Sequence, residues 1–191
     1  TLGSASRPFF LHKCSCCSGL LSRQDAAPAG NKNKPFRSDM DIFERPEEAD
    51  VKRLLAESGL PTADITAEHL LHFFGCGPKG ELQGVVGLEI YGTVALLRSL
   101  AVTAGKQRTG IGTELVGHAE SYARENGIES LYLLTSAAEA FFLRRGYSRI
   151  PRENAPGAIE ATGEFSGLCP ASSTFMVKHL VGNPHFKMRI T

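Results

Sequence analysis

The residues best suited to chemistry lie in a basic, glycine-containing loop that joins a strand to a helix. An apolar strand is predicted to end near Val102, and a strongly amphipathic helix is predicted to begin at Gly110. The first backbone N–H groups of a helix have no intrahelical acceptor, and the helix dipole favours an anion beside them. Because Gly110 and Gly112 carry no Cβ, the phosphates of a ligand can approach the backbone closely. The loop therefore predicts a site for a diphosphate.

Side chains of the same loop strengthen this prediction. Lys106 and Arg108 contribute positive charge, and the hydroxyl of Thr113 can donate a hydrogen bond. The glycine spacing matches neither the G-x-G-x-x-G of dinucleotide-binding folds nor the G-x-x-x-x-G-K-[ST] of P-loop proteins. The diphosphate is therefore expected to belong to another kind of ligand. An ordinary strand-to-helix turn with incidental glycines is the alternative.

The hydrophobic pattern places this loop within an alternation of strands and helices. Strands are predicted over residues 41–44, 72–76, 82–90, 94–102, 131–134, 147–150 and 174–179, and helices over residues 46–58, 66–71, 110–126 and 137–145. Three consecutive strands favour an antiparallel meander, whereas the later strand–helix–strand passage requires a parallel pair. The expected fold class is therefore α/β, in the α+β sense of a mixed central sheet with helices on both faces.

The loop also carries a family motif. Residues 107–112 read Gln-Arg-Thr-Gly-Ile-Gly and match the Q/R-x-x-G-x-G/A signature of GNAT acetyltransferases. From Asp41 to about Leu180 the chain resembles this family. The resemblance implies the GNAT acyl-CoA N-acyltransferase fold, acetyl-CoA as cosubstrate and no metal ion. It places the pyrophosphate of acetyl-CoA on Gln107, Arg108, Thr109, Gly110, Ile111, Gly112 and Thr113.

The strand before the loop has its own role in this resemblance. GNAT folds place a β-bulge in the strand that corresponds to Leu97–Val102, and a bulge splays a strand from its neighbour. The backbone of Leu100, Ala101 and Val102 is then expected to bind the pantetheine arm. A nearby backbone N–H is expected to polarise the acetyl carbonyl.

Two positions depart from the family pattern. Many GNAT enzymes have a tyrosine at the position of Phe142, which protonates the leaving CoA thiolate, and many have an asparagine at the position of Thr135. Phe142 cannot donate a proton, so Phe142 and Thr135 are expected to contact the cofactor only. Tyr147 is the catalytic candidate for the missing donor, with Tyr132 and Ser136 as alternatives.

A narrower resemblance concerns the acceptor. Residues 131–135 and 140–147 resemble the acetyltransferase domain of amino-acid N-acetyltransferases such as N-acetylglutamate synthase. Residues 151–156 and 161–172 are similar to GNAT proteins associated with arsenic resistance. The resemblance implies a small-molecule amine as acceptor, an amino acid or an amino-acid-like toxin. A protein or peptide N-acetyltransferase and an acyl-CoA-binding regulatory module without turnover are the alternatives.

Other side chains are candidates for contact with the acceptor. Glu89 stands in an otherwise apolar strand and is predicted to act as general base, unless it faces solvent. Arg98, an isolated charge in the next strand, could bind a substrate carboxylate, unless it lies on an exposed face. Residues 151–173 form a long connection that is expected to cover the acceptor site. Its polar candidates are Arg152, counted as substrate-binding, and Glu160, Glu164 and Ser166.

Composition argues against several other functions. The 191 residues are 42% hydrophobic and 21% charged, with a net charge of +1, which is ordinary for a globular protein and unlike a nucleic-acid binder. No apolar run approaches the ~20 residues needed to span a membrane. Five cysteines are too few and too uneven for a disulfide framework, so a reducing compartment, the cytoplasm, is expected. Cys14, Cys16 and Cys17 lack the paired spacing of a zinc site.

The chain is predicted to hold one domain between two tails. Residues 1–39 are basic and rich in small residues, and they are interpreted as a disordered tail, an extension upstream of Met40 or an organelle-targeting peptide. Residues 40–181 form the predicted acetyltransferase domain, and residues 182–191 form a C-terminal tail. A homodimer is left open.

Overall fold

A mixed sheet organises residues 40–78 and 80–180, which are the residues that the computed structural model describes. Its seven strands lie in the order β1-β2-β3-β4-β5-β7-β6. The strands are β1 Ile42–Glu44, β2 Phe73–Cys76, β3 Gly84–Tyr91, β4 Val94–Val102, β5 Ser130–Thr135, β6 Ser148–Arg149 and β7 Thr174–His179. Only β4 and β5 pair in parallel, and the other pairs are antiparallel. The predicted meander and the predicted parallel pair are both confirmed.

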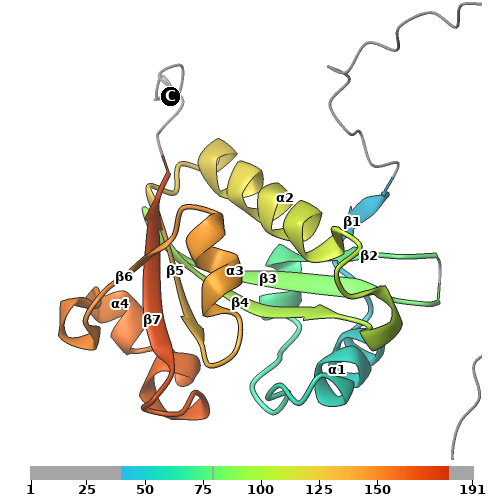
Figure 1. Cartoon of the computed structure of the whole chain (residues 1–191), viewed down its shortest axis with the longest axis horizontal. Helices are drawn as coiled ribbons and strands as arrows, with labels where there is room; N and C mark the ends of the chain where they lie inside the picture. Colours follow the sequence, from blue (N-terminus) through green and yellow to red (C-terminus); the bar gives the residue numbers. More distant parts are fainter. Residues whose placement is uncertain (1–39, 79, 181–191) are drawn as a thin grey trace, which may run out of the picture. The chain divides into compact units, whose positions relative to one another are not determined.

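Helices cover both faces of the sheet (Figure 1). They are α1 Glu48–Glu57, α2 Ile111–Glu125, α3 Glu139–Arg144 and α4 Gly157–Glu160, with shorter turns η1 His69–His72, η2 Ala104–Lys106, η3 Arg152–Asn154 and η4 Glu164–Leu168. Helices α2 and α3 share one hydrophobic core with the sheet, whereas α1 and α4 belong to two separate cores. The expected fold class, a mixed central sheet with helices on both faces, is therefore confirmed.

The long helix α2 forms because its apolar residues return every three or four positions. Leu115, Val116, Ala119 and Ala123 are all fully buried on one side of the helix. They share their core with side chains of β3 and β4, including Leu88. This packing fixes the beginning of α2, and with it the phosphate loop, against the end of β4.

Some elements differ from their prediction. The helix expected over residues 66–71 is a single 3₁₀ turn at His69–His72. Glu68 is the N-cap of this turn, and the Oγ1 of Thr66 accepts a hydrogen bond from the backbone N–H of His69 at 3.4 Å. Strand β7 lies between β5 and β6, so the last two strands are antiparallel neighbours although a long connection joins them. The long connection after β6 allows this, because it crosses one face of the sheet before β7 begins.

A β-bulge interrupts β4 where the resemblance predicted one. Val85 and Gly87 of β3 pair with Ala101 and Arg98 of β4, so two steps along β3 correspond to three steps along β4. Ser99 has a positive φ of 55° at this point. The extra residue locally disrupts the ladder and turns backbone groups of β4 away from β3.

Strands β4 and β5 separate just before this bulge. Their parallel register runs through three pairs and ends at Leu96 and Tyr132, although both strands continue. Figure 1 shows β3 and β4 crossing the view while β5 and β7 run steeply across it. Backbone edges of both strands are therefore left open toward the space between them.

Gly87 lies beside the β-bulge and allows β2 to approach β3 closely. A Cβ at Gly87 would overlap the fully buried ring of Phe73. We expect Gly87→Ala to lower the free energy of unfolding by about 1–3 kcal/mol, because an overpacked core must shift its side chains or backbone. Chemical denaturation measures this change. Gly105→Ala is the control, since a Cβ there meets nothing within 4 Å, and equal stability of both variants would contradict the packing argument.

Candidate active site

The separation of β4 and β5 leaves a pocket of about 540 Å³. Its lining comes from residues 58–61, 97–102, Gln107, residues 133–138, Phe142, Glu164, residues 168–170 and Ser173. The bulge therefore lies in the wall of the pocket, and the long connection after β6 contributes another wall. This volume is typical of sites for small ligands.

The phosphate loop lies where β4 ends and α2 begins. Gly110 is the N-cap of α2 and has a φ of 100°, a backbone conformation that favours glycine. Among the described residues, none accepts a hydrogen bond from the backbone N–H groups of residues 107–112. These donors, placed at the positive end of a helix 15 residues long, fit a diphosphate.

The side chains of the loop hold its shape. Gln107 Nε2 donates to the carbonyl of Val102 at 3.3 Å, and Thr109 Oγ1 donates to the carbonyl of Lys106 at 2.6 Å. Arg108 and Thr113 are exposed, whereas Ile111 is buried and anchors the start of α2. The predicted cofactor residues of the loop thus have three roles. Backbone N–H groups are free to bind a ligand, the side chains of Gln107 and Thr109 stabilise the loop, and Ile111 packs into the core.

The pocket wall contains the other predicted cofactor residues. Leu100, Ala101 and Val102 line it from the bulged strand, and Thr135 and Phe142 line it from the opposite side. The Thr135 hydroxyl accepts a hydrogen bond from the backbone N–H of Ala138 at 2.9 Å. That bond shapes the turn before α3 and leaves the hydroxyl proton free to donate.

Tyr147 lies away from the pocket. Its ring packs against Phe142 in the core under α2, and its hydroxyl is buried beside Glu120. Burial is the main cause that raises the pKa of Tyr147, and the Glu120 carboxylate raises it further. The structure therefore does not bring this proposed proton donor to the wall of the pocket.

A buried ion cluster surrounds Arg98, which lines the pocket. Its Nη1 donates to Glu89, its Nη2 donates to Asp64 at 2.5 Å, and its Nε lies 3.1 Å from Glu164. Burial opposes the charged form, but the carboxylates of Glu164 and Glu89 outweigh it, so the pKa of Arg98 is raised. Arg98 therefore does not lie on an exposed face, and its guanidinium is already occupied by protein carboxylates.

Glu89 is held firmly within this cluster. It is 7% exposed, so the solvent-facing alternative is wrong. Its Oε2 accepts a hydrogen bond from the Tyr91 hydroxyl at 2.7 Å, and His69 Nε2 lies 3.7 Å from Oε1. Burial and this bond to Glu89 raise the pKa of Tyr91 to about 12. Glu89 is absent from the described lining of the pocket, and its role as general base stays a prediction.

Glu164 faces the pocket from the long connection. Burial raises its pKa from 4.5 to about 7, against the opposing effect of Arg98 and with the help of Glu89 and Asp64. Cys169 lines the same wall, where burial and then Glu164 raise the pKa of its thiol to about 11. A carboxyl group that titrates near neutral pH in a ligand pocket is a strong candidate for proton transfer.

The other polar candidates of the long connection are absent from the described lining of the pocket, namely Arg152, Glu160 and Ser166. Arg152 stacks over the ring of Phe165, with 4.9 Å from its Cζ to the ring centre, and its Nη2 donates to the carbonyl of Pro170 at 3.5 Å. It braces the pocket wall rather than lining it.

Asp64 was missed by sequence reasoning as a partner of Arg98, because a loop residue 34 positions away gives no periodic signal.

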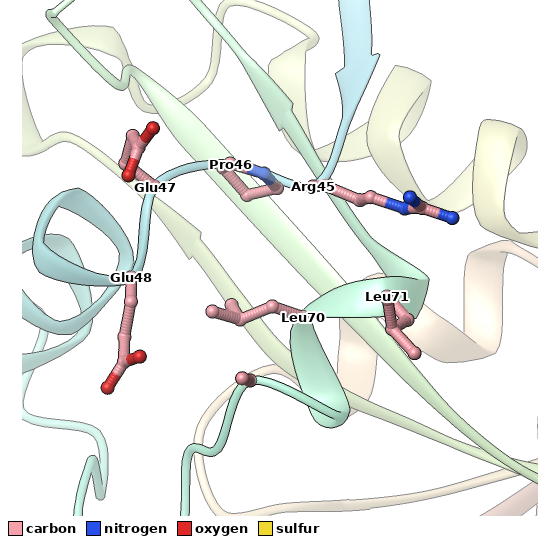
Figure 2. A pocket seen from close by; sticks show the side chains of 7 residues that line it. Arg45, Pro46, Glu47, Glu48, Leu70 and Leu71 are labelled. Carbon is pink, nitrogen blue, oxygen red and sulfur yellow. The ribbon is translucent and has the colours of Figure 1, made fainter.

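A smaller hollow of about 230 Å³ lies elsewhere (Figure 2). It is lined by residues 45–48, Ala67, Leu70 and Leu71, near the start of α1. Figure 2 shows the side chain of Arg45 pointing away from Glu47 and Glu48, and no converging set of polar groups is seen among these labelled residues. The hollow therefore lacks the features of a catalytic site.

Residues 40–78 and 80–180 contain neither a membrane-spanning helix nor a cluster of metal ligands. None of their helices is long and apolar enough to cross a membrane. Within the same residues, no group of three or more His, Cys, Asp or Glu side chains is arranged to hold a metal ion. The cysteines at positions 14, 16 and 17 and both predicted tails lie outside the described residues.

The mixed sheet, the bulged strand and the phosphate loop together define the GNAT acyl-CoA N-acyltransferase fold, and comparison of the sequence with known families agrees. The profile of the acetyltransferase (GNAT) family matches residues 36–147. This match covers more than half of the 191 residues, so the chain belongs to the acetyltransferase (GNAT) family.

Individual proteins that are similar to this chain match only part of it. An uncharacterized N-acetyltransferase of Chlorobaculum tepidum is 38% identical over 94 residues, which are 48% of this chain and 59% of the relative. N-acetylglutamate synthase of Neisseria gonorrhoeae, solved with coenzyme A and N-acetyl-glutamate, has a TM-score of 0.63 at 22% identity over 74% of this chain and 35% of its own. Rv2747 of Mycobacterium tuberculosis, solved with CoA, has a TM-score of 0.60 at 18% sequence identity. The match covers 74% of this chain and 99% of Rv2747. The chain thus spans only part of its first relatives, and the solved structures share the fold.

The second glycine of the loop provides a test of the phosphate site. A Cβ at Gly112 would make ordinary contacts of 3.8 Å with Val102 and 3.9 Å with Phe141, so the fold can accept it. We expect Gly112→Ala to weaken CoA binding by about tenfold or more, because the methyl group blocks the approach of phosphates to the backbone. Isothermal titration calorimetry with CoA measures this loss. Ser121→Ala, on the exposed side of α2, is the control, and equal affinities would contradict the site.

The raised pKa of Glu164 predicts a pH-dependent stability. The folded state binds this proton more tightly than the unfolded state, so the stabilisation is complete below pH 4.5 and is lost as the pH rises through about 7. Glu164→Gln should remove the loss, and its stability relative to wild type should rise over this window by up to about 1.4 kcal/mol per pH unit. Chemical denaturation at pH 5, 6, 7 and 8 measures this, with exposed Glu153→Gln as control. A relative stability that falls with pH would contradict it.

Proposed function

We propose that this protein transfers the acetyl group of acetyl-CoA to a primary amine of a small molecule. The pocket between β4 and β5 carries this proposal, because it joins a phosphate-binding loop to a buried cluster of carboxylates. The unpaired N–H groups of residues 107–112 would hold the pyrophosphate. The open edge of the bulge at Leu100 and Val102 would bind the pantetheine arm.

The thioester, when bound, supplies an activated acetyl group. The chain's own residues then orient it, with a backbone N–H of the bulged strand toward the acetyl carbonyl, where negative charge develops during attack. Residues 168–170 and Ser173 form a wall that limits access of water from the side of the long connection. Holding an amine beside the thioester accounts for much of the expected rate, since it replaces a bimolecular encounter.

The acceptor is proposed to be an amino acid or an amino-acid-like toxin. The long connection supports a small acceptor, because it walls the pocket where a peptide acceptor would need an open groove. The relation in fold to a protein named N-acetylglutamate synthase is consistent with an amino-acid acceptor. A link to arsenic resistance rests on the resemblance of residues 151–156 and 161–172 alone.

A regulatory module that binds acetyl-CoA without turnover is the second candidate. Phe142 supports it, because the ring lines the pocket where many relatives carry a tyrosine that protonates the thiolate. The two candidates bind the same cosubstrate, so only turnover separates them.

A panel of acceptors tests the proposal. Release of the CoA thiol from acetyl-CoA is followed with free amino acids, phosphinothricin-type glutamate analogues, polyamines and short peptides. We expect turnover confined to an amino acid or analogue, because the walled pocket admits small molecules. Tight CoA binding without turnover on any acceptor would favour the regulatory candidate, and turnover only with peptides would overturn the small-molecule acceptor.

A further inference from the structure

We infer that Glu164 holds the ammonium group of the acceptor and accepts its proton before transfer. This inference rests on the proposed function, and it replaces Glu89 as the group that performs this step. It assigns a catalytic role to the long connection between β6 and β7, a segment outside the residues matched by the family profile.

Position is the first argument for Glu164. Glu164 lines the same pocket as Leu100 and Ala101, so it shares one cavity with the bulged backbone that would orient the thioester. The side chain is 11% exposed, which leaves part of it accessible from the pocket. Its backbone belongs to a single turn of π-helix, η4, that begins at Glu164 itself.

Free bonding capacity is the second argument. The oxygens of Glu89 are occupied by Arg98 and by the Tyr91 hydroxyl. Asp64 uses Oδ2 for Arg98, and its Oδ1 is buried without a partner among the described residues. Glu164 meets Arg98 through Oε1 only, at 3.1 Å. Of the three carboxylates, Glu164 is therefore the one that combines access to the pocket with a second oxygen for a ligand.

Charge is the third argument. Three carboxylates surround one guanidinium, so the cluster carries an excess of acidic groups in a buried place. The groups that face Glu164 are Arg98 on β4, Glu89 on β3, Asp64 before η1 and Cys169 on its own segment. An ammonium group placed against Glu164 would offset this excess, which favours acceptors that arrive as cations or zwitterions.

The proposed step balances in atoms and charge. Glu164 takes one proton from R–NH₃⁺, which leaves a neutral amine and a neutral carboxylic acid. The amine nitrogen bonds to the acetyl carbon, the carbon–sulfur bond breaks, and CoA leaves with the electron pair. The second nitrogen proton goes to the CoA sulfur, which gives the amide and the free thiol. Glu164 returns its proton to solvent after the product leaves.

The pH dependence of kcat/KM tests this role. For wild type acting on any acceptor of the panel described above, we expect the rate to rise with pH and to level off near 7, where the Glu164 carboxylate forms. Glu164→Gln should lose about 10²-fold or more at pH 7, and should recover tenfold per pH unit as free amine becomes available in solution. The affinity for CoA, measured by calorimetry, should stay within about threefold.

Two variants sharpen the result. Glu153→Gln removes an exposed carboxylate of the same connection and should keep the wild-type profile. Glu89→Gln should keep the rising limb, moved to lower pH because the Glu89 carboxylate no longer raises the pKa of Glu164. If Glu89→Gln loses that limb and Glu164→Gln keeps it, the inference is wrong. If the wild-type protein turns over no acceptor, the proposed function fails and the inference fails with it.

Discussion

The early separation of β4 from β5 is the constraint on which the rest of the structure depends. A parallel pair inside a sheet normally satisfies its backbone groups along its whole length, but here pairing stops at Leu96 and Tyr132. The bulge at Ser99 makes this stable by turning the chain before more ladder bonds could form. Backbone donors and acceptors are thereby offered to a ligand in the middle of a buried sheet, where water would otherwise have to satisfy them.

The Arg98 cluster joins the parts of the chain that border this opening. One guanidinium contacts carboxylates from β3, from the loop before η1 and from the long connection after β6. Burying so many charges is costly, and removal of one partner from a buried ion pair costs more than the pair contributes. The cluster therefore fixes where Glu164 lies relative to the bulge, and the position of Glu164 decides what the acceptor meets.

Sequence reasoning predicted the backbone half of the site and named most of its charged residues, but it did not predict how those residues meet. The phosphate loop has a local signature, since Gly110 and the start of α2 are neighbours in sequence, and the succession of strands and helices along the chain followed from periodicity. Asp64 and Arg98 meet only in the folded chain, and no pattern in either segment indicates the other. The alternation rule also left Glu89 ambiguous, because a strand packed on both sides buries its polar residue as readily as its apolar ones.

The same pocket argues for direct transfer over a covalent acetyl-enzyme. Cys169 is the cysteine in the described lining, and a thiol must ionise to act as a nucleophile. Burial, and after it the Glu164 carboxylate, raise its pKa to about 11, so at neutral pH the group is a thiol. Burial and the carboxylate that would prepare an amine for attack thus together disfavour the thiolate that a covalent acetyl-enzyme would need. The pocket therefore favours the amine as the attacking group over the competing protein nucleophile.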